Sequence, residues 1–331
     1  MRQSLYHCWT SSALCGVVLA LAGIGAAGPQ SRPDISTDGF RVLSWNVSDD
    51  AFVRDPAGFK AMLTRADADI LLFDEVGPAT TERQLSAVVA GRRREGSNAW
   101  HIAVGRSGGR QRGVIVSRQP VESLPELSGA VPYPPRDRER IHKRMLEADA
   151  DRPGYSMDGG IPVNGAIVRA AGRRLLVVIL DLQCCGDDPA SWEEDRRRVE
   201  TGEIRTRIEQ VLKRTTVDGV IVAGDFNLVS TPLPMVIMSG PYPLPHGGLI
   251  AAELRQLDGI ETWTWDGTGS PFPSRAMDFV LYSPNALRLR SGFILDSADL
   301  PRGELDRLGL ESDSARRLSQ HRPLVTEFVW Q

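Results

Sequence analysis

Apolar residues follow two patterns along the chain from Phe40 onward. Runs of strand length, such as "FRVLSWNV" from Phe40 and "RRLLVVILDLQ" from Arg173, predict buried strands. Between such runs, apolar residues spaced three and four positions apart, as in 59–66, predict amphipathic helices. Strands outnumber helices, and helical crossovers separate several of them. We therefore expect an α/β (α+β) protein in which helices cover mixed sheets.

The same patterns place further elements. Strands are predicted at "DILLFDEV", "AWHIAVG", "RGVIVSRQPV", "GVIVAGDFN", "ETWTW", "AMDFVLYS" and "RLRSGFIL", and after Pro323. Helices are predicted from an Asp55 cap with Pro56 in the first turn, near Thr80 to Gly91, from Asp188-Pro189, and near Leu249 to Leu257. The Pro-rich and charged stretch 121–160, which contains "RDRERIHKR", is typical of a solvated face or loop. A loop that faces phosphate is the alternative.

The composition is that of an ordinary globular protein. The chain has 331 residues, of which 41% are hydrophobic and 24% charged, and a chain of this length can bury a large core. No linker-like stretch or repeat interrupts it, so we expect one domain over 38–331. The net charge of −3 excludes a strongly basic nucleic-acid binder. A nuclease with a local basic patch remains compatible with that charge.

The first 28 residues differ from the rest. "MRQSLYHCWTSS" carries one Arg, "ALCGVVLALAGIGAAG" is an apolar run of signal-peptide length, and small residues surround Ala27. This pattern predicts a secretory signal and an exported protein, periplasmic or secreted. An uncleaved N-terminal anchor is the alternative. Beyond this segment only Cys184 and Cys185 remain, and we expect two small buried thiols, because neighbouring residues on a strand point to opposite faces.

Polar side chains of catalytic type stand at the ends of the predicted strands. They are Asn46, Glu75, Asp181, Asp225 with Asn227, Asp278 within its strand, and His321 immediately before the last strand. Any one of them alone is typical of a turn or a cap. Groups at the ends of strands in one sheet converge on one edge, so their joint occurrence indicates a functional site.

The set resembles the endonuclease/exonuclease/phosphatase superfamily, which has the deoxyribonuclease I-like fold. The matching motifs are "LSWNV", "DILLFDEV", "RGVIVSRQPV", "VAGDFN", "AMDFVLYS" and "SQHRPLV", in family order over essentially the whole chain after the signal. The resemblance implies two packed mixed β-sheets flanked by helices in a four-layer sandwich. It also implies a divalent-metal phosphodiesterase or phosphatase site at one edge.

Two residues of the set are expected to bind a metal ion. By the resemblance, Glu75 is the principal ligand, with Asn46 beside it as an amide oxygen. Magnesium prefers oxygen ligands and is typically held by one or two carboxylates, so Mg²⁺ is the expected ion, with Mn²⁺ or Ca²⁺ as alternatives. A hard cation offsets the negative charge that builds up on a phosphoester during attack.

The remaining residues take catalytic roles by the same resemblance. Asp225 orients or deprotonates the attacking water, and Asn227 contacts the phosphate or helps to hold Asp225. His321 stabilises the phosphate as imidazolium or transfers a proton. Asp278 is its expected partner, which keeps the imidazole charged near neutral pH.

Two positions depart from the family pattern. The family usually reads Ser-Asp-His where this chain has Gln320 before His321, so Gln320 offers the metal a neutral oxygen at most. Asp181 stands near where many relatives have His or Tyr. A carboxylate there cannot neutralise a phosphate, so Asp181 is expected to bind a metal or act as a general base. A non-catalytic binding protein on the same fold is therefore a second hypothesis.

The substrate class stays open at this level. Nucleic acid is slightly favoured, because "GRRREG" at Gly91 to Gly96 and "RDRERIHKR" could supply basic loops. Sphingomyelinase-like or inositol-phosphate phosphatase activity is the alternative, with "SGPYPLPHGG" as a candidate lipid-facing hairpin. Trp263 and Trp265 are expected to pack as strand residues. The sequence identifies no protein partner and no oligomeric state.

Overall fold

The computed structural model describes residues 39–48, 50–89 and 100–331, all within one compact unit that begins at Ser36. The predicted signal segment 1–28, residue 38 and the basic stretch Gly91 to Gly96 lie outside the described residues. Within the described ranges, no helix has both the length and the apolar character needed to cross a bilayer.

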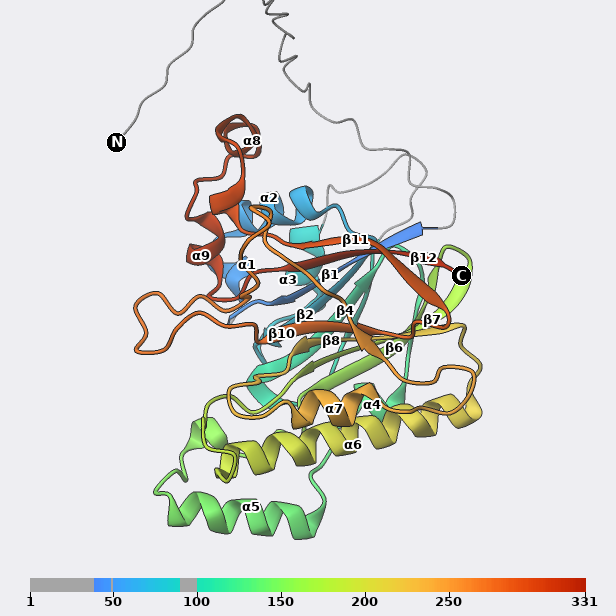
Figure 1. The fold of residues 1–331 in the computed structure, drawn as a ribbon, viewed down its shortest axis with the longest axis vertical. Helices are drawn as coiled ribbons and strands as arrows, with labels where there is room; N and C mark the ends of the chain where they lie inside the picture. Colours follow the sequence, from blue (N-terminus) through green and yellow to red (C-terminus); the bar gives the residue numbers. More distant parts are fainter. Residues whose placement is uncertain (1–38, 49, 90–99) are drawn as a thin grey trace, which may run out of the picture. The chain divides into compact units, whose positions relative to one another are not determined.

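Two six-stranded sheets are formed by the described part of the chain (Figure 1). The first has the order β11 (Leu287–Ile294), β12 (Leu324–Trp330), β1 (Gly39–Asn46), β2 (Ile70–Val76), β4 (Arg112–Ser117) and β3 (His101–Val104). The second has the order β5 (Val121–Ser123), β6 (Val163–Ala170), β7 (Arg173–Asp181), β8 (Gly219–Asp225), β10 (Asp278–Tyr282) and β9 (Ile250–Ala251). The pairs β1–β2 and β7–β8 are parallel and the other pairs are antiparallel.

The sheets pack face to face through apolar residues on the inner side of their central strands. In β7, Leu175, Val177 and Ile179 join an inter-sheet core, whereas Leu176 and Val178 face the helices. A strand that is covered on both faces reads as a continuous apolar run. The run "LLVVIL" that predicted this strand therefore reflects a position inside the sandwich.

Helices cover the outer face of each sheet (Figure 1). Against the first sheet pack α1 (Ala51–Arg54), α2 (Pro56–Ala66), α3 (Glu82–Val89), α8 (Arg302–Leu308) and α9 (Ser314–Leu318). On the second sheet's side lie α4 (Pro125–Ser128), α5 (Pro135–Glu147), α6 (Trp192–Arg214) and α7 (Leu233–Ser239). Short 3₁₀ turns occupy Gly109–Gln111, Pro153–Tyr155 and Ser297–Asp299. The four-layer arrangement expected from the sequence is confirmed.

Two helix starts show how local sequence sets the boundaries. The Asp55 carboxylate accepts a hydrogen bond from the Gly58 N–H at 2.9 Å, and Pro56 opens α2 as expected. The predicted start of α6 at Asp188 was wrong. Asp188 instead closes a turn by accepting from the Ala190 N–H, and Ser191 caps the helix by accepting from the Glu194 N–H at 3.2 Å.

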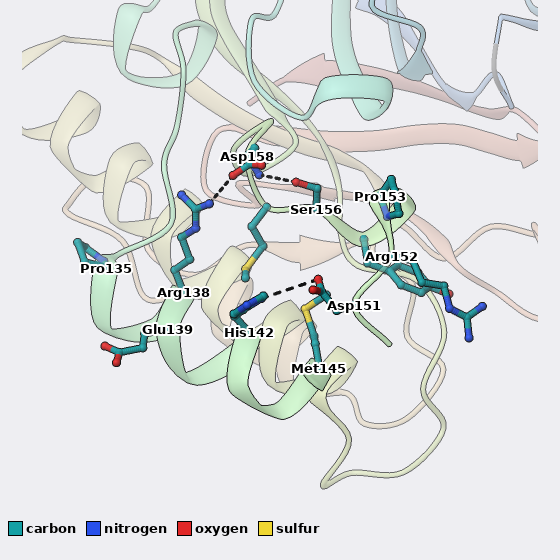
Figure 2. Close-up of a pocket in the computed structure, with 12 residues that line it drawn as sticks. Pro135, Arg138, Glu139, His142, Met145, Asp151, Arg152, Pro153, Ser156 and Asp158 are labelled. Atoms are coloured by element: carbon teal, nitrogen blue, oxygen red, sulfur yellow. Dashed lines mark hydrogen bonds and ion pairs between the residues drawn. The ribbon is translucent and has the colours of Figure 1, made fainter. Parts of the chain in front are cut away.

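The stretch "RDRERIHKR", predicted to be a solvated face or loop, is a helix whose charged side is solvated. Pro135 opens α5, and Ile141 and Met145, four residues apart, bury one face of it. Figure 2 shows Arg138 directed at Asp158. The basic side chains of this helix are thus matched by acidic neighbours, which weakens the case for α5 as a phosphate-binding surface.

The cavity beneath α5 is separate from the site described below. Its volume is about 590 Å³, and α5 and the loop 151–158 line it (Figure 2). His142 and Asp151 face each other across it at 3.9 Å. None of the residues that line it belongs to the predicted catalytic set.

Other differences concern short elements. "ETWTW" is not a strand, because Trp265 makes only isolated bridges to Arg275 and His321. The expected helix near Leu249 to Leu257 is replaced by the short edge strand β9. The helices α1, α4, α7, α8 and α9 were not predicted, because such short elements carry too few periodic positions to be distinguished by pattern. The strand β6 was not predicted either, because Asn164, Gly165 and Arg169 interrupt its apolar residues.

Candidate active site

Strand register brings three aspartates into one row. The strand β8 lies between β7 and β10, and Asp225 at its end is the register partner of both Asp181 and Asp278. In the other sheet, Asn46 at the end of β1 is paired with Asp74 on β2, next to Glu75. Residues far apart in sequence thus meet at one edge of the two packed sheets.

Two of these residues have left-handed backbone conformations. Glu75 has φ 54° and lies in an irregularity of the β2–β4 pairing between Phe73 and Val76, while Asn227 has φ 48° just after β8. Bulges and left-handed residues redirect side chains and are concentrated at functional sites. The turn at Asn227 lets its backbone N–H donate to Asp225 Oδ1 at 2.9 Å, which fixes that carboxylate.

His321 lies between two carboxylates. Its Nδ1 is 2.9 Å from Asp278 Oδ2, and its Nε2 is 3.8 Å from Asp225 Oδ2. Thr264 donates to the same Asp278 oxygen at 2.6 Å and thereby orients it. The predicted contact between Asp278 and His321 is confirmed.

The backbone around His321 is fixed by buried contacts. Trp45 Nε1 donates to the His321 carbonyl at 3.0 Å, and the His321 N–H donates to Ser319 Oγ at 3.0 Å. Ser319 in turn donates to the Asn46 carbonyl at 2.8 Å, which ties the histidine segment to β1. The imidazole is therefore held by the first sheet while it contacts carboxylates of the second.

Burial and mutual charge shift the titration of this group. Burial, together with the nearby Asp278 charge, raises the pKa of Asp225 to about 8. Burial alone would lower the pKa of His321, but Asp278 and Asp225 outweigh it and raise that pKa to about 10. At neutral pH the structure therefore favours an imidazolium at His321.

The Asn46 amide lies between Glu75 and Asp225. Its Nδ2 donates to Glu75 Oε1 at 3.0 Å and lies 3.4 Å from Asp225 Oδ2, while its Oδ1 accepts from the Ser48 N–H at 3.0 Å. This differs from the expectation that Asn46 offers its oxygen to a cation. The Ser48 N–H occupies one lone pair of that oxygen, while the Asn46 Nδ2 spaces and orients the two carboxylates.

Two residues of the site were not among those predicted from the sequence. Gln111 Nε2 donates to Asp181 Oδ2 at 2.8 Å, and neither oxygen of the fully buried Asp74 has a hydrogen-bond partner among the described residues. Asp74 was visible in the "DE" pair and points between the sheets by strand alternation. Gln111 had no signal, because its partner lies 70 residues away in sequence.

The predicted residues line or back one cavity of about 490 Å³. Glu75, Asp225, Asn227, Gln320 and His321 line it directly, and Gln320 is exposed at its surface. The others are buried behind these residues: Asn46, Asp181 and Asp278. The site residues of both sheets are therefore brought together, as the sequence predicted.

The chemistry of this donor set fits a divalent cation. Burial and the neighbouring charges of Glu75, Asp225 and Asp74 raise the pKa of Asp181, whose Oδ1 has no partner within the described residues. Carboxylate oxygens of Asp225 and Asp278 also lie within 4.8 Å of one another. A cation that prefers oxygen ligands stabilises crowded carboxylates whose oxygens lack hydrogen-bond partners.

Cysteines and tryptophans near the cavity differ from their predictions. Cys184 and Cys185 both line it, and Cys185 is exposed and not buried. Trp265 lines the cavity as well, whereas Trp263 packs beneath the Arg322 guanidinium, 5.1 Å from the ring centre. The segment that carries these tryptophans is irregular, so neither packs as a strand residue.

Comparison with protein families identifies the fold's relatives. The model of the Endonuclease/Exonuclease/phosphatase family matches residues 43–314. The chain belongs to this family. Members of it are hydrolases that act on phosphoester bonds, and this assigns the chain to the phosphoesterases. The comparison with curated proteins gave no match.

Solved structures share the fold of this family member at low identity. A humanized TDP2 from D. rerio has a TM-score of 0.53 and 17% identity, covering 88% of this chain and 98% of its own. The human Nocturnin catalytic domain with bound sulfate has a TM-score of 0.53 and 15% identity, covering 90% and 96%. An endonuclease/exonuclease/phosphatase from Beutenbergia cavernae has a TM-score of 0.52 and 16% identity, covering 88% and 72%.

Proposed function

We propose that this chain is a divalent-metal-dependent phosphodiesterase that hydrolyses its substrate by in-line attack of water. The observation that carries the proposal is the chain of contacts from Asp278 through His321 to Asp225, next to Glu75 in one open cavity. Buried groups with strongly shifted pKa values in a cleft are typical of catalytic sites.

Asp225 is the base in this proposal, and since its pKa is about 8 in the metal-free chain, it acts in its ionised form, which a bound cation would favour. Its Oδ1 is occupied by the Asn227 N–H, which leaves Oδ2 to face the cavity side near Asn46 and His321. Water held by Oδ2 would give up its proton to Asp225 as it attacks phosphorus. Asn227 acts through its backbone N–H, and its side chain is anchored by donating to the Leu182 carbonyl at 2.8 Å.

His321 supplies positive charge to the phosphate. Asp278 holds the Nδ1 side of the ring, so the Nε2–H is directed toward the cavity and Asp225. As imidazolium it donates to a non-bridging oxygen or protonates the leaving group. Because charge grows on both during attack, a fixed donor there lowers the barrier more than it stabilises the bound substrate.

Glu75 and Asp181 are the residues that would hold the cation, oriented by Asn46 and Gln111. When bound, a hard divalent cation offsets the charge of the phosphate and of its leaving group. We propose Mg²⁺ as the ion, with Mn²⁺ and Ca²⁺ as the alternatives. Gln320 lines the cavity but adds no negative charge, so we expect weak binding of the ion.

Nucleic acid is the favoured substrate in this proposal. One of the solved structures that share the fold is a D. rerio TDP2 complexed with a single-strand DNA product, at a TM-score of 0.50. Trp265, Phe272 and Arg275 line the cavity beside the catalytic residues. Aromatic and guanidinium groups of this kind stack on bases. We further propose, from the N-terminal pattern alone, that the protein is exported.

The experiment is a screen of the purified chain with Mg²⁺, Mn²⁺ and Ca²⁺ on plasmid DNA, RNA, sphingomyelin, inositol phosphates and a generic phosphate bis-ester. Asp225→Asn should reduce turnover on the hydrolysed class by about 10³-fold, because it removes the base. Asp306→Asn, at an exposed site on α8, is the matched control. Equal turnover in Asp225→Asn and wild type would refute the mechanism, and inactivity on every ester would favour a binding protein.

A further inference from the structure

Two adjacent cysteines form part of the catalytic cavity wall. The sulfur atoms of Cys184 and Cys185 are 2.9 Å apart, and both residues line the cavity. Neighbouring side chains on a strand would point to opposite faces. Here Cys185 and Gly186 both have left-handed backbones, with φ 69° and 68°, and the turn brings the two thiols together.

The turn is held in this shape by a buried guanidinium. Arg197 of α6, fully buried, donates to the carbonyls of Gln183 and Cys185, each at 2.7 Å, and to that of Gly186 at 3.1 Å. Its Nε pairs with Glu194 at 3.0 Å, which balances the charge. Because a buried guanidinium is stable only when its donors are satisfied, the conformation of residues 183–186 is strongly specified.

The pair has the features of a reactive dithiol. Cys185 is exposed, while Cys184 is half-buried. The hydrogen bond shared with Cys184 lowers the pKa of Cys185 to about 7, and it raises the pKa of Cys184 together with burial. The thiolate is the nucleophile in disulfide exchange, so Cys185 is positioned to react first, with the second thiol in contact.

We propose that Cys184 and Cys185 are a site of reversible oxidation by low-molecular-weight disulfides. Formation of a disulfide ring between the two cysteines then disturbs the adjacent end of β8, which carries Asp225. The Cys185 thiolate attacks one sulfur of the disulfide and releases the first small thiol. The Cys184 thiolate then attacks the Cys185 sulfur and releases the second. Two protein thiols are oxidised to one disulfide, and one small disulfide is reduced to two thiols.

The geometry indicates a switch and not a permanent cross-link. Adjacent Cα atoms are about 3.8 Å apart, whereas disulfide-linked Cα atoms are usually at least about 4.4 Å apart. A ring between neighbours is therefore strained, and strained, exposed disulfides are the readily reduced ones. The export proposed above would place the pair in an oxidising compartment.

The turn is joined directly to the catalytic pair. The Leu182 N–H donates to the Asp225 carbonyl at 2.9 Å, and the Leu182 carbonyl accepts from Asn227 Nδ2 at 2.8 Å. Closing the ring brings sulfurs from 2.9 Å to about 2.0 Å and pulls on this backbone. The effect on turnover rests on the proposed function, but the thiol chemistry does not.

The test uses the full chain with Cys8→Ser and Cys15→Ser, which leaves only the vicinal pair. The protein is equilibrated in glutathione buffers from reducing to oxidising. In the oxidising buffer we expect both free thiols to be lost together. The mass of the protein should fall by two hydrogen atoms, and no glutathione should be attached. Amides of 182–186 and 225–227 should exchange with solvent about tenfold faster, and turnover should fall about tenfold, as expected for loss of one supporting hydrogen bond.

The variant that carries both Cys184→Ser and Cys185→Ser in the same background is the matched control. It has no thiol left to oxidise at this turn, so its exchange and turnover should have the same values in both buffers. Free thiols or a persistent glutathione adduct in the parent would overturn the proposal. A ring that forms without a change at 225–227 would overturn the coupling. Absence of any phosphoesterase activity defeats the proposed function, while mass and exchange still decide this inference.

Discussion

At the scale of single residues, a small number of groups fixes the imidazole of His321. His321 has one carboxylate on each side, and Thr264 and the Asn227 N–H orient those carboxylates. The backbone of His321 is separately anchored through Trp45 and Ser319. Position and charge of the ring are therefore controlled by different residues and can be altered one at a time.

Asp278→Asn should change the charge of His321 without moving it. The amide oxygen of Asn can still accept from Nδ1–H, but the loss of negative charge should lower the pKa of His321 from about 10. We expect kcat to fall about 10²-fold or more, since removal of one transition-state donor has effects of this size.

The measurements are steady-state kinetics and an NMR titration of the His321 ring in the metal-free protein. Asp306→Asn, which is exposed on α8, controls for the loss of one aspartate. The partnership of Asp278 and His321 would be disproved by wild-type turnover together with an unchanged ring pKa.

At the scale of elements, the site depends on close approach between β7 and β8. Gly224 immediately precedes Asp225 and has φ 128°, and a Cβ built there would lie 1.9 Å from the Leu180 carbonyl oxygen. No side chain other than hydrogen fits this space. The "GD" of the motif is therefore explained by packing as well as by chemistry.

Gly224→Ala should destabilise the protein by about 3 kcal/mol or more, because both the left-handed backbone and the contact with β7 oppose a methyl group. Gly202→Ala is the matched control, since its Cβ on α6 meets no atom within 4 Å. That change should stabilise by about 0.5–1 kcal/mol. Urea unfolding of both variants measures this, and equal stabilities would contradict the explanation.

At the scale of the whole molecule, the first and the last strand of the described chain are neighbours in the first sheet. The strand β1 at the start pairs with β12 at the end, and Glu327 on β12 pairs with Arg41 of β1 at 2.8 Å and with Arg290 of β11 at 3.1 Å. The site also needs both sheets, because His321 is held by the first and Asp225 and Asp278 belong to the second. Catalytic geometry is thus linked to docking of the two sheets.

The carboxylate of Glu327 makes this link dependent on pH, and Glu327→Gln should remove that dependence. Burial opposes ionisation of Glu327, but the hydrogen bonds from Arg41 and Arg290 lower its pKa below the usual 4.5. A lowered folded pKa contributes stability that is present above 4.5 and lost as the pH falls through the folded value.

The variant should therefore be less stable than wild type by about 1–2 kcal/mol at pH 7, and the difference should shrink in acid. Chemical unfolding at several pH values provides the test. A difference of constant size from pH 7 into acid would show that the charge of Glu327 is not responsible.

The sequence by itself determined the strand ends, the family and most of the site. Long apolar runs favoured buried strands, and Asp55-Pro56 correctly predicted the start of α2, whereas the same pattern at Asp188-Pro189 lies in the turn before α6. Asp225, Asp278 and His321 were predictable for a related reason. Strands that share a sheet end on a common edge, so the groups just beyond them converge.

Only the tertiary structure decided the contacts between distant segments. The orientation of the Asn46 amide, the support of Asp181 by Gln111 and the paired thiols at Cys184 and Cys185 depend on neighbours that periodicity does not specify. The sequence left a solvated face or a loop open for the charged stretch of α5, and its ion pairs with Asp158 and Asp195 depend on segments elsewhere in the chain. Local sequence sets backbone preferences, whereas hydrogen-bond partners and charge pairs follow from packing.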